Sequence, residues 1–488
     1  MPASVPLMAK TPFLLDLKPL AEASSAYAGV LATSRVFRSL GLPTVIESAL
    51  KLKKRQRGFS EAQMVENLVL LQTLGGDCPE DISLLARDAC IARGLGYEVP
   101  KVTAVREFLA NFHDPQQEQL RPPRQEQRSF IFPQSAPVEA LQQVQATAVQ
   151  RIAALYEQRG VGLHIATIDQ DATIIESHKA AAQPHYQGGR GYQPMLALWA
   201  EADLVVADQF RDGNVPAVQD PLTCARMAFA SLPSSVHTRY FRADCACYEQ
   251  QLLSWLSDPE RQREPAGPIG FAISAALNPS LSKALRAVPE EQWKTFAKES
   301  DGTLRQWAEV DFVPSRRYEH KGSEPLRYVG LRLLQPQGAL FADGSDRHYH
   351  AVVSNLDWDG GRLLQWQREK AGSIEHVHDE IKNGLGGSHL PSQRFNVNAA
   401  WMKIVLLAYN LASAVKGLCF SFEERTARFK RYRLLAVYVS GRMNRNNCVM
   451  RLRLCASAET IARLAKIWEV FALPTQASSL RPRGGRGA

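Results

Sequence analysis

The sequence predicts a mixed α/β fold, for three reasons. Residues 30–113 carry apolar residues at helical spacing, interrupted by short turns that contain glycine. From residue 161 the pattern changes to strand, hairpin, helix and strand, which is the order of an α/β protein with a mixed sheet. The stretch between about 267 and 356 is rich in strands, and helices return after it.

The composition limits the class of protein. A chain of 488 residues suggests about two to four domains of roughly 150 residues each. Hydrophobic residues make up 45% and charged residues 22%, and the formal net charge of +9 favours polyanionic partners over acidic ones. The cysteines form no C-x-x-C pair, which disfavours a zinc ribbon and indicates a reduced chain. We see no signal peptide or apolar run of about 18 residues, so we expect a soluble cytoplasmic protein without a membrane partner.

The first predicted region is a helical bundle. Ser60 and Gln63 have the spacing of a capping box at the start of one helix, and Gly75 follows its end. Asp77 is predicted to cap a second helix that carries Pro79 in its first turn. One interpretation is a helix-turn-helix-like bundle that contacts DNA, and the other is a helical cap or dimerisation domain. The basic residues before the first of these helices are Lys51, Lys53, Lys54, Arg55 and Arg57.

Changes of period mark the elements that follow the bundle. Residues 121–137 have the Pro, Gln and Arg content of a linker, and a helix runs from there to Arg159. A strand over 161–177 precedes a hairpin that turns near Glu201 to Asp203. The later predictions are a helix at 221–232, a strand that runs into a helix over 236–256, helices at 363–384 and 395–417, a hairpin of strands 432–441 and 447–455, and a helix at 458–471.

Four acidic residues stand out by their context. Asp169 and Asp171 lie two apart inside one predicted strand, so both side chains point to the same face. Asp244 ends the strand RYFRAD, just before a turn of small residues. Glu375 lies on a predicted helix, where His378, Asp379 and Lys382 share its face at spacings of three, four and seven.

These carboxylates predict a metal site. Strand ends are where α/β sheets place ligands, and a carboxylate from a covering helix can converge there. Divalent cations remove the repulsion between such carboxylates, and hard oxygen ligands suit Mg²⁺. Two ions about 3.5–4 Å apart would clamp the attacking and leaving oxygens of a phosphodiester. The competing interpretation is that the aspartates are caps or turn formers and that Glu375 is solvated. No H-E-x-x-H, G-x-S-x-G or P-loop motif suggests another chemistry.

Several ordered blocks resemble the DDE transposases of bacterial insertion sequences, specifically the insertion sequence 1380 group. The blocks are IDQDATIIESHK, YQGGRGYQPMLALW, LVVADQFRDGNVP, YFRADCACYE, EHVHDEIKNGLG, NVNAAWMKIVLLAYNLASAVK and RYRLLAVYVSGRM, and they cover the chain from about residue 30 to 470. The resemblance implies an RNase H-like catalytic core that uses Mg²⁺, with Mn²⁺ as a substitute. It also implies cutting and joining of DNA at terminal inverted repeats and a homodimer on the DNA. The expected location is the bacterial cytoplasm, in association with the nucleoid.

The resemblance assigns roles to single residues. Asp171 is the first catalytic aspartate, because it directly precedes Ala172 and Thr173, and Asp169 is the alternate or a supporting group. Asp244 is the second aspartate and Glu375 the third carboxylate, and these three would hold the metal. Lys382 stands seven residues after Glu375, as the family signature requires. The signature's arginine position holds Ala371 and its tyrosine position holds Arg368, so Arg368 would take over the phosphate contact from one helical turn away.

Further phosphate contacts are expected from the basic segments, which carry affinity without sequence information. They are the run at residues 51–57 together with Arg428, Lys430 and Arg431 within 425–433, and the arginines within 442–453. The alternative for residues 425–453 is a hairpin with ordinary solvated edges. Trp358 and Trp366 could stack on an unpaired base, although packing in the core is the better interpretation of either one alone.

The resemblance also divides the chain into expected parts. They are a helical N-terminal DNA-binding or dimerisation domain (1–120), a linker and helix (121–160), the first part of the RNase H-like core (161–265), a β-rich insertion (266–365), the second part of the core (366–418), a C-terminal hairpin and helix (419–474) and a disordered basic tail (475–488). Two other functions are compatible with the same carboxylates and basic segments. They are an RNase H-like nuclease that does not join strands, and a DNA-binding protein whose catalytic core has decayed.

Overall fold

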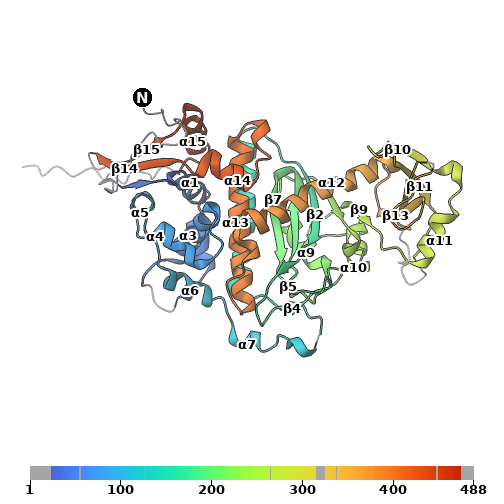
Figure 1. The fold of residues 1–488 in the computed structure, drawn as a ribbon, viewed down its shortest axis with the longest axis horizontal. Helices are drawn as coiled ribbons and strands as arrows, with labels where there is room; N and C mark the ends of the chain where they lie inside the picture. The colour runs from blue at the N-terminus through green and yellow to red at the C-terminus, as the bar shows by residue number, and fades with distance from the viewer. Residues whose placement is uncertain are drawn as a thin grey trace, which may run out of the picture.

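The computed structural model describes residues 23–53, 57–126, 128–263, 265–314, 325–336, 338–446 and 449–473. Figure 1 shows a helical body at one end of the molecule, a sheet in the middle and a β-rich region at the other end. Lys54, Arg55 and the tail at 475–488 lie outside the described residues, so their expected roles stay predictions. The cysteines of the described residues form no disulfide bond.

The central sheet confirms the predicted mixed α/β fold. Strand β2 lies inside the sheet. It pairs in parallel with β8 and antiparallel with β6, β6 pairs antiparallel with β7, and β8 pairs in parallel with β9. The predicted hairpin turns at Asp203, which has a positive φ of 51°. The bounds are β2 (Ile165–Ala172), β6 (Met195–Trp199), β7 (Leu204–Gln209), β8 (Thr238–Ala243) and β9 (Gly270–Ser274). Beyond β2, the short strands β3 (Ile175–Glu176), β4 (Gln183–Pro184) and β5 (Arg190–Tyr192) form a separate small sheet.

The strand-rich stretch after β9 extends the same sheet instead of forming a separate one. In the described residues the sheet has the order β10-β11-β12-β13-β9-β8-β2-β6-β7, with β13 antiparallel to β9. A small apolar cluster that includes Trp307 and Leu363 lies between this extension and the helix that follows it. The bounds are α11 (Pro279–Ala287), which the sequence did not predict, β10 (Lys294–Lys298), β11 (Leu304–Val310), β12 (Arg327–Leu334) and β13 (Arg347–Ser354).

Helices cover both faces of the central sheet. On one face, Gln170 donates a hydrogen bond from Nε2 to the carbonyl oxygen of Pro221, the first residue of α9 (Pro221–Ala230). Asp169 and Asp171, on the opposite face of β2, contact α12 (Gly360–Asp379). Helix α10 (Gln250–Ser257) packs beside α9. The faces of β2 are therefore divided between α9 and α12 by the two-residue repeat of the strand.

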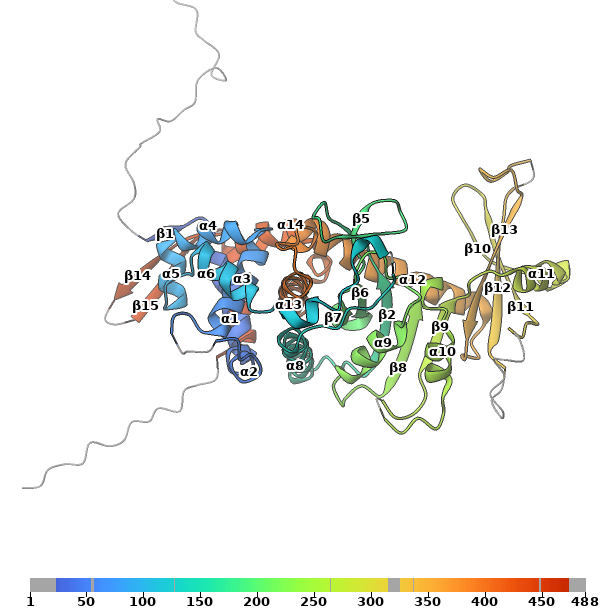
Figure 2. The same cartoon turned by 90° about the horizontal axis from the view of Figure 1, so that it is seen from below.

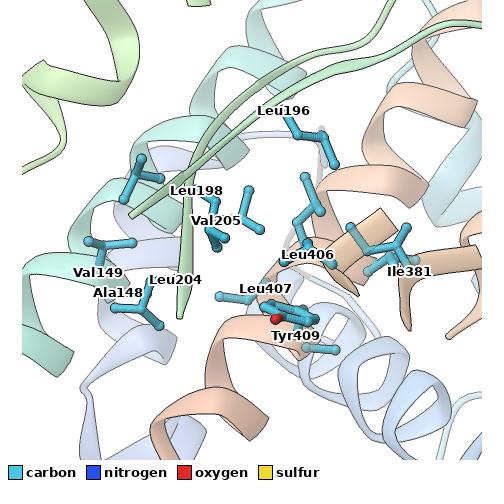
Figure 3. Packing of buried hydrophobic residues seen from close by; sticks show 14 of the residues in the cluster. Ala148, Val149, Leu196, Leu198, Leu204, Val205, Ile381, Leu406, Leu407 and Tyr409 are labelled. Carbon is cyan, nitrogen blue, oxygen red and sulfur yellow. The ribbon is translucent and has the colours of Figure 1, made fainter. Parts of the chain in front are cut away.

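Helix α13 (Phe395–Cys419) forms the centre of the core. Its side chains pack against α8 (Ala136–Gln158), β7 and α3 (Glu61–Leu74), and Figure 3 shows Leu406, Leu407 and Tyr409 among leucines and valines of β6, β7 and α8. Among the described helices, α13 alone is long and apolar enough to span a membrane, but 89% of the window concerned is buried inside the protein. This burial accounts for its apolar composition.

The N-terminal helices agree with the predicted bundle, with one correction. Ser60 and Gln63 form the predicted capping box of α3, and Gly75 ends the helix in the left-handed conformation with a φ of 95°. Asp77 is not a cap, because Asp81 instead accepts hydrogen bonds from the backbone N–H groups of Asp77 and Cys78. Nearly every residue of α3 is buried, so this helix has no free face for DNA. The bounds are α1 (Leu31–Ser39), α2 (Leu42–Ala49), α4 (Ile82–Ala86), α5 (Ala89–Leu95), α6 (Val102–Ala110) and α7 (Pro115–Glu118).

The two ends of the described chain pack together. Strand β1 (Ser24–Ser25) pairs with β14 (Ser440–Asn446), β14 pairs with β15 (Val449–Cys455), and α15 (Ala458–Val470) packs on α1. The predicted strand at 432–441 is wrong over most of its length, because α14 (Phe429–Tyr432) and a π-helix (Arg433–Val437) precede β14. The cause is tertiary: the buried Arg433 donates hydrogen bonds to the carbonyl oxygens of Gln72, Thr73 and Gly384. Whether the predicted ranges are separate domains stays a prediction.

A buried ion pair joins α13 to the sheet and yields a stability prediction. Lys403 Nζ lies 2.7 Å from Asp208 Oδ1, and both side chains are inaccessible to solvent. Lys403→Met leaves the carboxylate without a cation, so we expect it to lower the free energy of unfolding by about 3–5 kcal/mol. Urea unfolding of the variant measures this loss. Lys403→Met combined with Asp208→Asn is expected to recover most of the loss, and a single variant as stable as the wild type would contradict the prediction.

Candidate active site

Two of the predicted carboxylates meet at the ends of neighbouring parallel strands. Asp171 is the penultimate residue of β2, and Asp244 directly follows β8. Asp244 caps the short turn behind it, where its Oδ1 accepts a hydrogen bond from the N–H of Ala246 at 3.0 Å. Burial and the negative charge of Asp171 raise the pKa of Asp244 above its ordinary value, against the opposing effect of Lys370. The site therefore concentrates negative charge in a poorly solvated place.

A buried lysine neutralises this charge. Lys370 of α12 places its Nζ 3.1 Å from Asp171 Oδ2, and its side chain is only 8% exposed. Burial alone would lower the pKa of Lys370, but the attraction of Asp171 and Asp244 raises it above the ordinary value of a lysine. Sequence reasoning missed this residue. The available signal was its spacing, because Lys370 recurs with Ile374, Val377 and Ile381 on the apolar face of the helix, where a charge needs a partner.

The partner of Asp169 is a basic side chain. Arg242 lies opposite Asp169 on β8 and donates to both carboxylate oxygens, at 2.7 and 2.9 Å. Ser373 of α12 donates a further hydrogen bond to the same carboxylate. Arg242 also donates to the carbonyl oxygen of Trp366 and pairs with Glu369. The Asp169 carboxylate is fully buried and its hydrogen-bonding capacity is used inside the protein, which suits a supporting role more than metal binding.

Glu375 is on the expected helix but is not in contact with the two aspartates. Its side chain is exposed, and within the described part of the chain it makes no hydrogen bond or ion pair. His378 lies three residues after Glu375 on α12. Its side chain is buried, and burial lowers its pKa to about 3. Burial also lowers the pKa of Lys382, while the nearby negative charge of Asp171 acts in the opposite direction. Lys382 therefore lies within electrostatic reach of Asp171.

Arg368 pairs with the β-rich extension and not with either aspartate. Its guanidinium is exposed and pairs with Glu299 of the loop after β10 at 2.9 Å. With Arg305, His350 and Asp244 it lines a cavity of about 490 Å³ between the extension and the end of β8. Its expected phosphate contact stays a prediction.

The two tryptophans belong to a packed aromatic group. Trp358, Trp366 and Tyr240 lie with ring centroids 5.2–5.5 Å apart, and Arg242 lies over Trp366 at 5.1 Å. The structure therefore supports the packing interpretation over base stacking.

The expected DNA-contacting residues lie on the surface at two places. Lys51 and Arg57 are exposed near the start of α3, and Lys53 is partly exposed. Lys430 and Arg431 are exposed on α14. Arg428 pairs with Asp379 at 2.6 Å, which places it at the end of α12, next to the π-helix Glu380–Gly384 that carries Lys382. Their contacts with DNA stay predictions.

The residues present fit a divalent cation by donor chemistry. Asp171 and Asp244 bring hard carboxylate oxygens together, and each uses one oxygen for a backbone N–H group. The second oxygen of Asp171 faces Lys370, whose ammonium group is the kind of charge that a bound cation would replace. Glu369 is engaged with Arg242, so Glu375 is the carboxylate of α12 that remains available. These features agree with a site for which Mg²⁺ is chemically suited.

Comparison with known proteins identifies the class. The sequence profile of the family described as "Transposase DDE domain group 1" matches residues 21–474, and the chain therefore belongs to this family of DDE transposases. Such enzymes cut and join DNA with the aid of a divalent metal. No curated protein matches the chain in sequence.

Among solved structures, the chain is similar to one described as a piggyBac transposase synaptic complex with hairpin DNA. The sequences are 12% identical, the match covers 84% of this chain and 80% of the other, and the TM-score is 0.42.

The raised pKa of Asp244 predicts a pH-dependent gain of stability on substitution. A carboxyl group whose pKa is higher in the folded state stabilises the fold below its unfolded pKa and loses this contribution as the pH rises through the folded value. In EDTA at neutral pH, Asp244→Asn should therefore unfold at a higher urea concentration than the wild type, since asparagine keeps the cap to Ala246. The difference should vanish at a pH below the ordinary value of an aspartate. An equal loss of stability at every pH would contradict the assignment.

Proposed function

We propose that this chain is a transposase of the insertion sequence 1380 group, which cuts and joins DNA at the terminal inverted repeats of its element. The observation that carries the proposal is the position of Asp171 and Asp244 at the ends of adjacent parallel strands. The buried Lys370 of α12 supplies the positive charge beside them. A charged cluster of this kind costs stability and is expected at a functional site. Family membership supplies the reaction class.

The strand order supports an RNase H-like core. Five strands in the order β7-β6-β2-β8-β9, with an antiparallel hairpin on one side and parallel crossovers on the other, carry both aspartates at the same edge of the sheet. Along the chain, strands β10–β13 stand between this core and α12, the helix that bears Glu375. This is the place of the expected β-rich insertion.

Asp171, Asp244 and Glu375 would hold Mg²⁺ or Mn²⁺. Divalent cations at this place supply Lewis-acid activation of the attacking oxygen and stabilise charge that develops on the phosphate. The position of Asp171 and Asp244 at neighbouring strand ends supports their part in this set, and the exposed Glu375 of α12 would be the third ligand. Asp169 acts indirectly, because its ion pair with Arg242 fixes β2 and β8 in register.

Basic groups would position the DNA phosphates at the same edge. Lys382 lies within electrostatic reach of Asp171, and Arg428 is paired at the same end of α12. As fixed positive charges they would hold a terminal phosphate while the 3′-hydroxyl attacks target DNA. Work on two element ends calls for a homodimer, and a bacterial cytoplasmic location at the nucleoid follows from the substrate.

Cleavage and joining of labelled DNA that carries the element's ends test the function. We expect activity with Mg²⁺, none with EDTA, and a loss of at least about a hundredfold in Asp171→Asn, Asp244→Asn and Glu375→Gln. Asp169→Asn is the matched control, because it keeps the shape of the side chain and changes a residue outside the metal set. Its activity should track its stability.

Two results would reject the proposal. Cleavage without joining would identify a nuclease, and binding of the ends without cleavage would identify a decayed DNA-binding protein. Retained activity in Glu375→Gln, with loss in the other two variants, would remove Glu375 from the metal set and leave the class intact.

Lys370 provides a test that does not depend on turnover. Lys370→Met leaves two partly buried carboxylates without their cation, so in EDTA we expect a loss of about 3 kcal/mol in the free energy of unfolding. Added Mn²⁺ should raise the melting temperature of the variant more than that of the wild type, since the ion takes over the neutralising charge. Equal melting temperatures in EDTA would show that Lys370 does not neutralise the site.

A further inference from the structure

Three polar side chains of α12 follow one another at a spacing of three residues. They are Gln367, Lys370 and Ser373, and this spacing places them along one side of the helix. Lys370 pairs with Asp171, and Ser373 donates a hydrogen bond to Asp169. Both views show α12 running from the β-rich end of the molecule towards α13 (Figures 1 and 2). The helix therefore meets the acidic part of the sheet through a row of polar side chains, and Gln367 is the first of the row.

Gln367 binds the ends of two neighbouring parallel strands. Its Nε2 donates one hydrogen bond to the carbonyl oxygen of Ala243, at 3.2 Å, and another to Ser274 Oγ, at 3.0 Å. Ala243 is the last residue of β8, and Ser274 is the last residue of β9. A carbonyl oxygen only accepts hydrogen bonds, so the nitrogen of the amide must face it. One side chain thus attaches α12 to both strand ends.

The bond to Ala243 acts directly on Asp244. The carbonyl group of Ala243 and the backbone N–H of Asp244 belong to one planar peptide unit, so a partner that holds the oxygen fixes the plane from which Asp244 begins. On its other side, the Asp244 carboxylate is held by the N–H of Ala246. Glu375 lies eight residues after Gln367 on the same helix, which is about 12 Å along its axis. Gln367 therefore connects the helix that bears Glu375 with the strand end that bears Asp244.

Packing alone does not account for a glutamine at this place. The apolar contacts of this part of α12 come from Leu363 and Leu364, which are buried in the small cluster with Trp307. Gln367 is half-buried, and together with Asp244 it lines the cavity of about 490 Å³ between the extension and the end of β8. Ordering a glutamine side chain costs more conformational entropy than ordering a leucine, and here the two hydrogen bonds offset that cost.

We propose that Gln367 is a positioning residue of the carboxylate site, which holds Asp244 in the place where it serves as a metal ligand. The inference rests on the proposed function, because it concerns the divalent cation that Asp171 and Asp244 would hold. Residues that hold a metal ligand from behind commonly change the metal affinity by about ten- to a hundredfold when they are replaced. Gln367 acts through Asp244 and is not itself a ligand.

Binding of Mn²⁺ to the full chain, without DNA, tests the proposal. The affinity is measured by isothermal titration calorimetry for the wild type, Gln367→Met and Gln365→Met. Methionine keeps the length of the side chain but donates no hydrogen bond, so we expect Gln367→Met to bind Mn²⁺ on the order of tenfold more weakly. Gln365 is the matched control, because it is an exposed glutamine of the same helix whose side chain makes no hydrogen bond in the described residues. Its variant should bind Mn²⁺ like the wild type.

Stability separates a positioning role from a structural one. Loss of the two hydrogen bonds from a half-buried amide should lower the melting temperature of Gln367→Met in EDTA by only about 2–4 °C. In the cleavage assay, the Mn²⁺ concentration that gives half the maximal rate should rise by the same factor as the dissociation constant, while KM for the DNA ends stays unchanged. A lower melting temperature with unchanged Mn²⁺ affinity would assign Gln367 a structural role and overturn the proposal.

A second variant keeps the test decisive if Gln367→Met does not fold. Ser274→Ala removes one of the two acceptors with a small change of volume, and it should weaken Mn²⁺ binding in the same direction by a smaller factor. Wild-type affinity in every variant that folds would overturn the proposal. A wild type that binds no Mn²⁺ and joins no DNA would overturn the proposed function as well, which distinguishes the two failures.

Discussion

The burial of Asp169 and Asp171 on one face of β2 is the constraint on which the rest of the structure depends. Two carboxylates on the same covered face need compensating charge from elsewhere in the chain. Arg242 supplies it to Asp169 from the neighbouring strand, and Lys370 supplies it to Asp171 from α12. These two ion pairs join β2, β8 and α12, and they place Asp244 beside Asp171. The same charges that hold the helix on the sheet therefore build the candidate active site.

The two aspartates differ in what surrounds them. Asp169 is fully buried and held by Arg242 and Ser373, whereas Asp171 and Asp244 remain partly open. Asp169 therefore maintains the packing of β2 and β8 with α12. Asp171 and Asp244 can exchange the positive charge of Lys370 for that of a metal ion. Burial and the charge of Asp171 raise the pKa of Asp244 against the opposing charge of Lys370, and the charges of Asp171 and Asp244 raise the pKa of Lys370 against its burial. Stability is given up there, as expected of a functional site.

Local signals in the sequence predicted the elements that local interactions determine. The capping box of Ser60 and Gln63 depends on neighbours in the chain, and it is present. The predicted hairpin turn is also present at Asp203, although Tyr409 and Ser413 of α13 hold its carboxylate as well. The strand predicted at 432–441 failed because Arg433 is held by carbonyl groups more than three hundred residues away in sequence, at Gln72 and Thr73. Lys370 was missed for a similar reason. Helical spacing shows that it lies on an apolar face, but only the packing of α12 on β2 shows what it meets.

An X-ray structure of crystals soaked in Mn²⁺ tests the central claim most directly. We predict an anomalous peak between the carboxylates of Asp171 and Asp244, with Lys370 Nζ moved away from Asp171 and the Glu375 side chain turned toward the ion. An undisturbed pair of Lys370 and Asp171, with manganese bound elsewhere or not at all, would contradict the account.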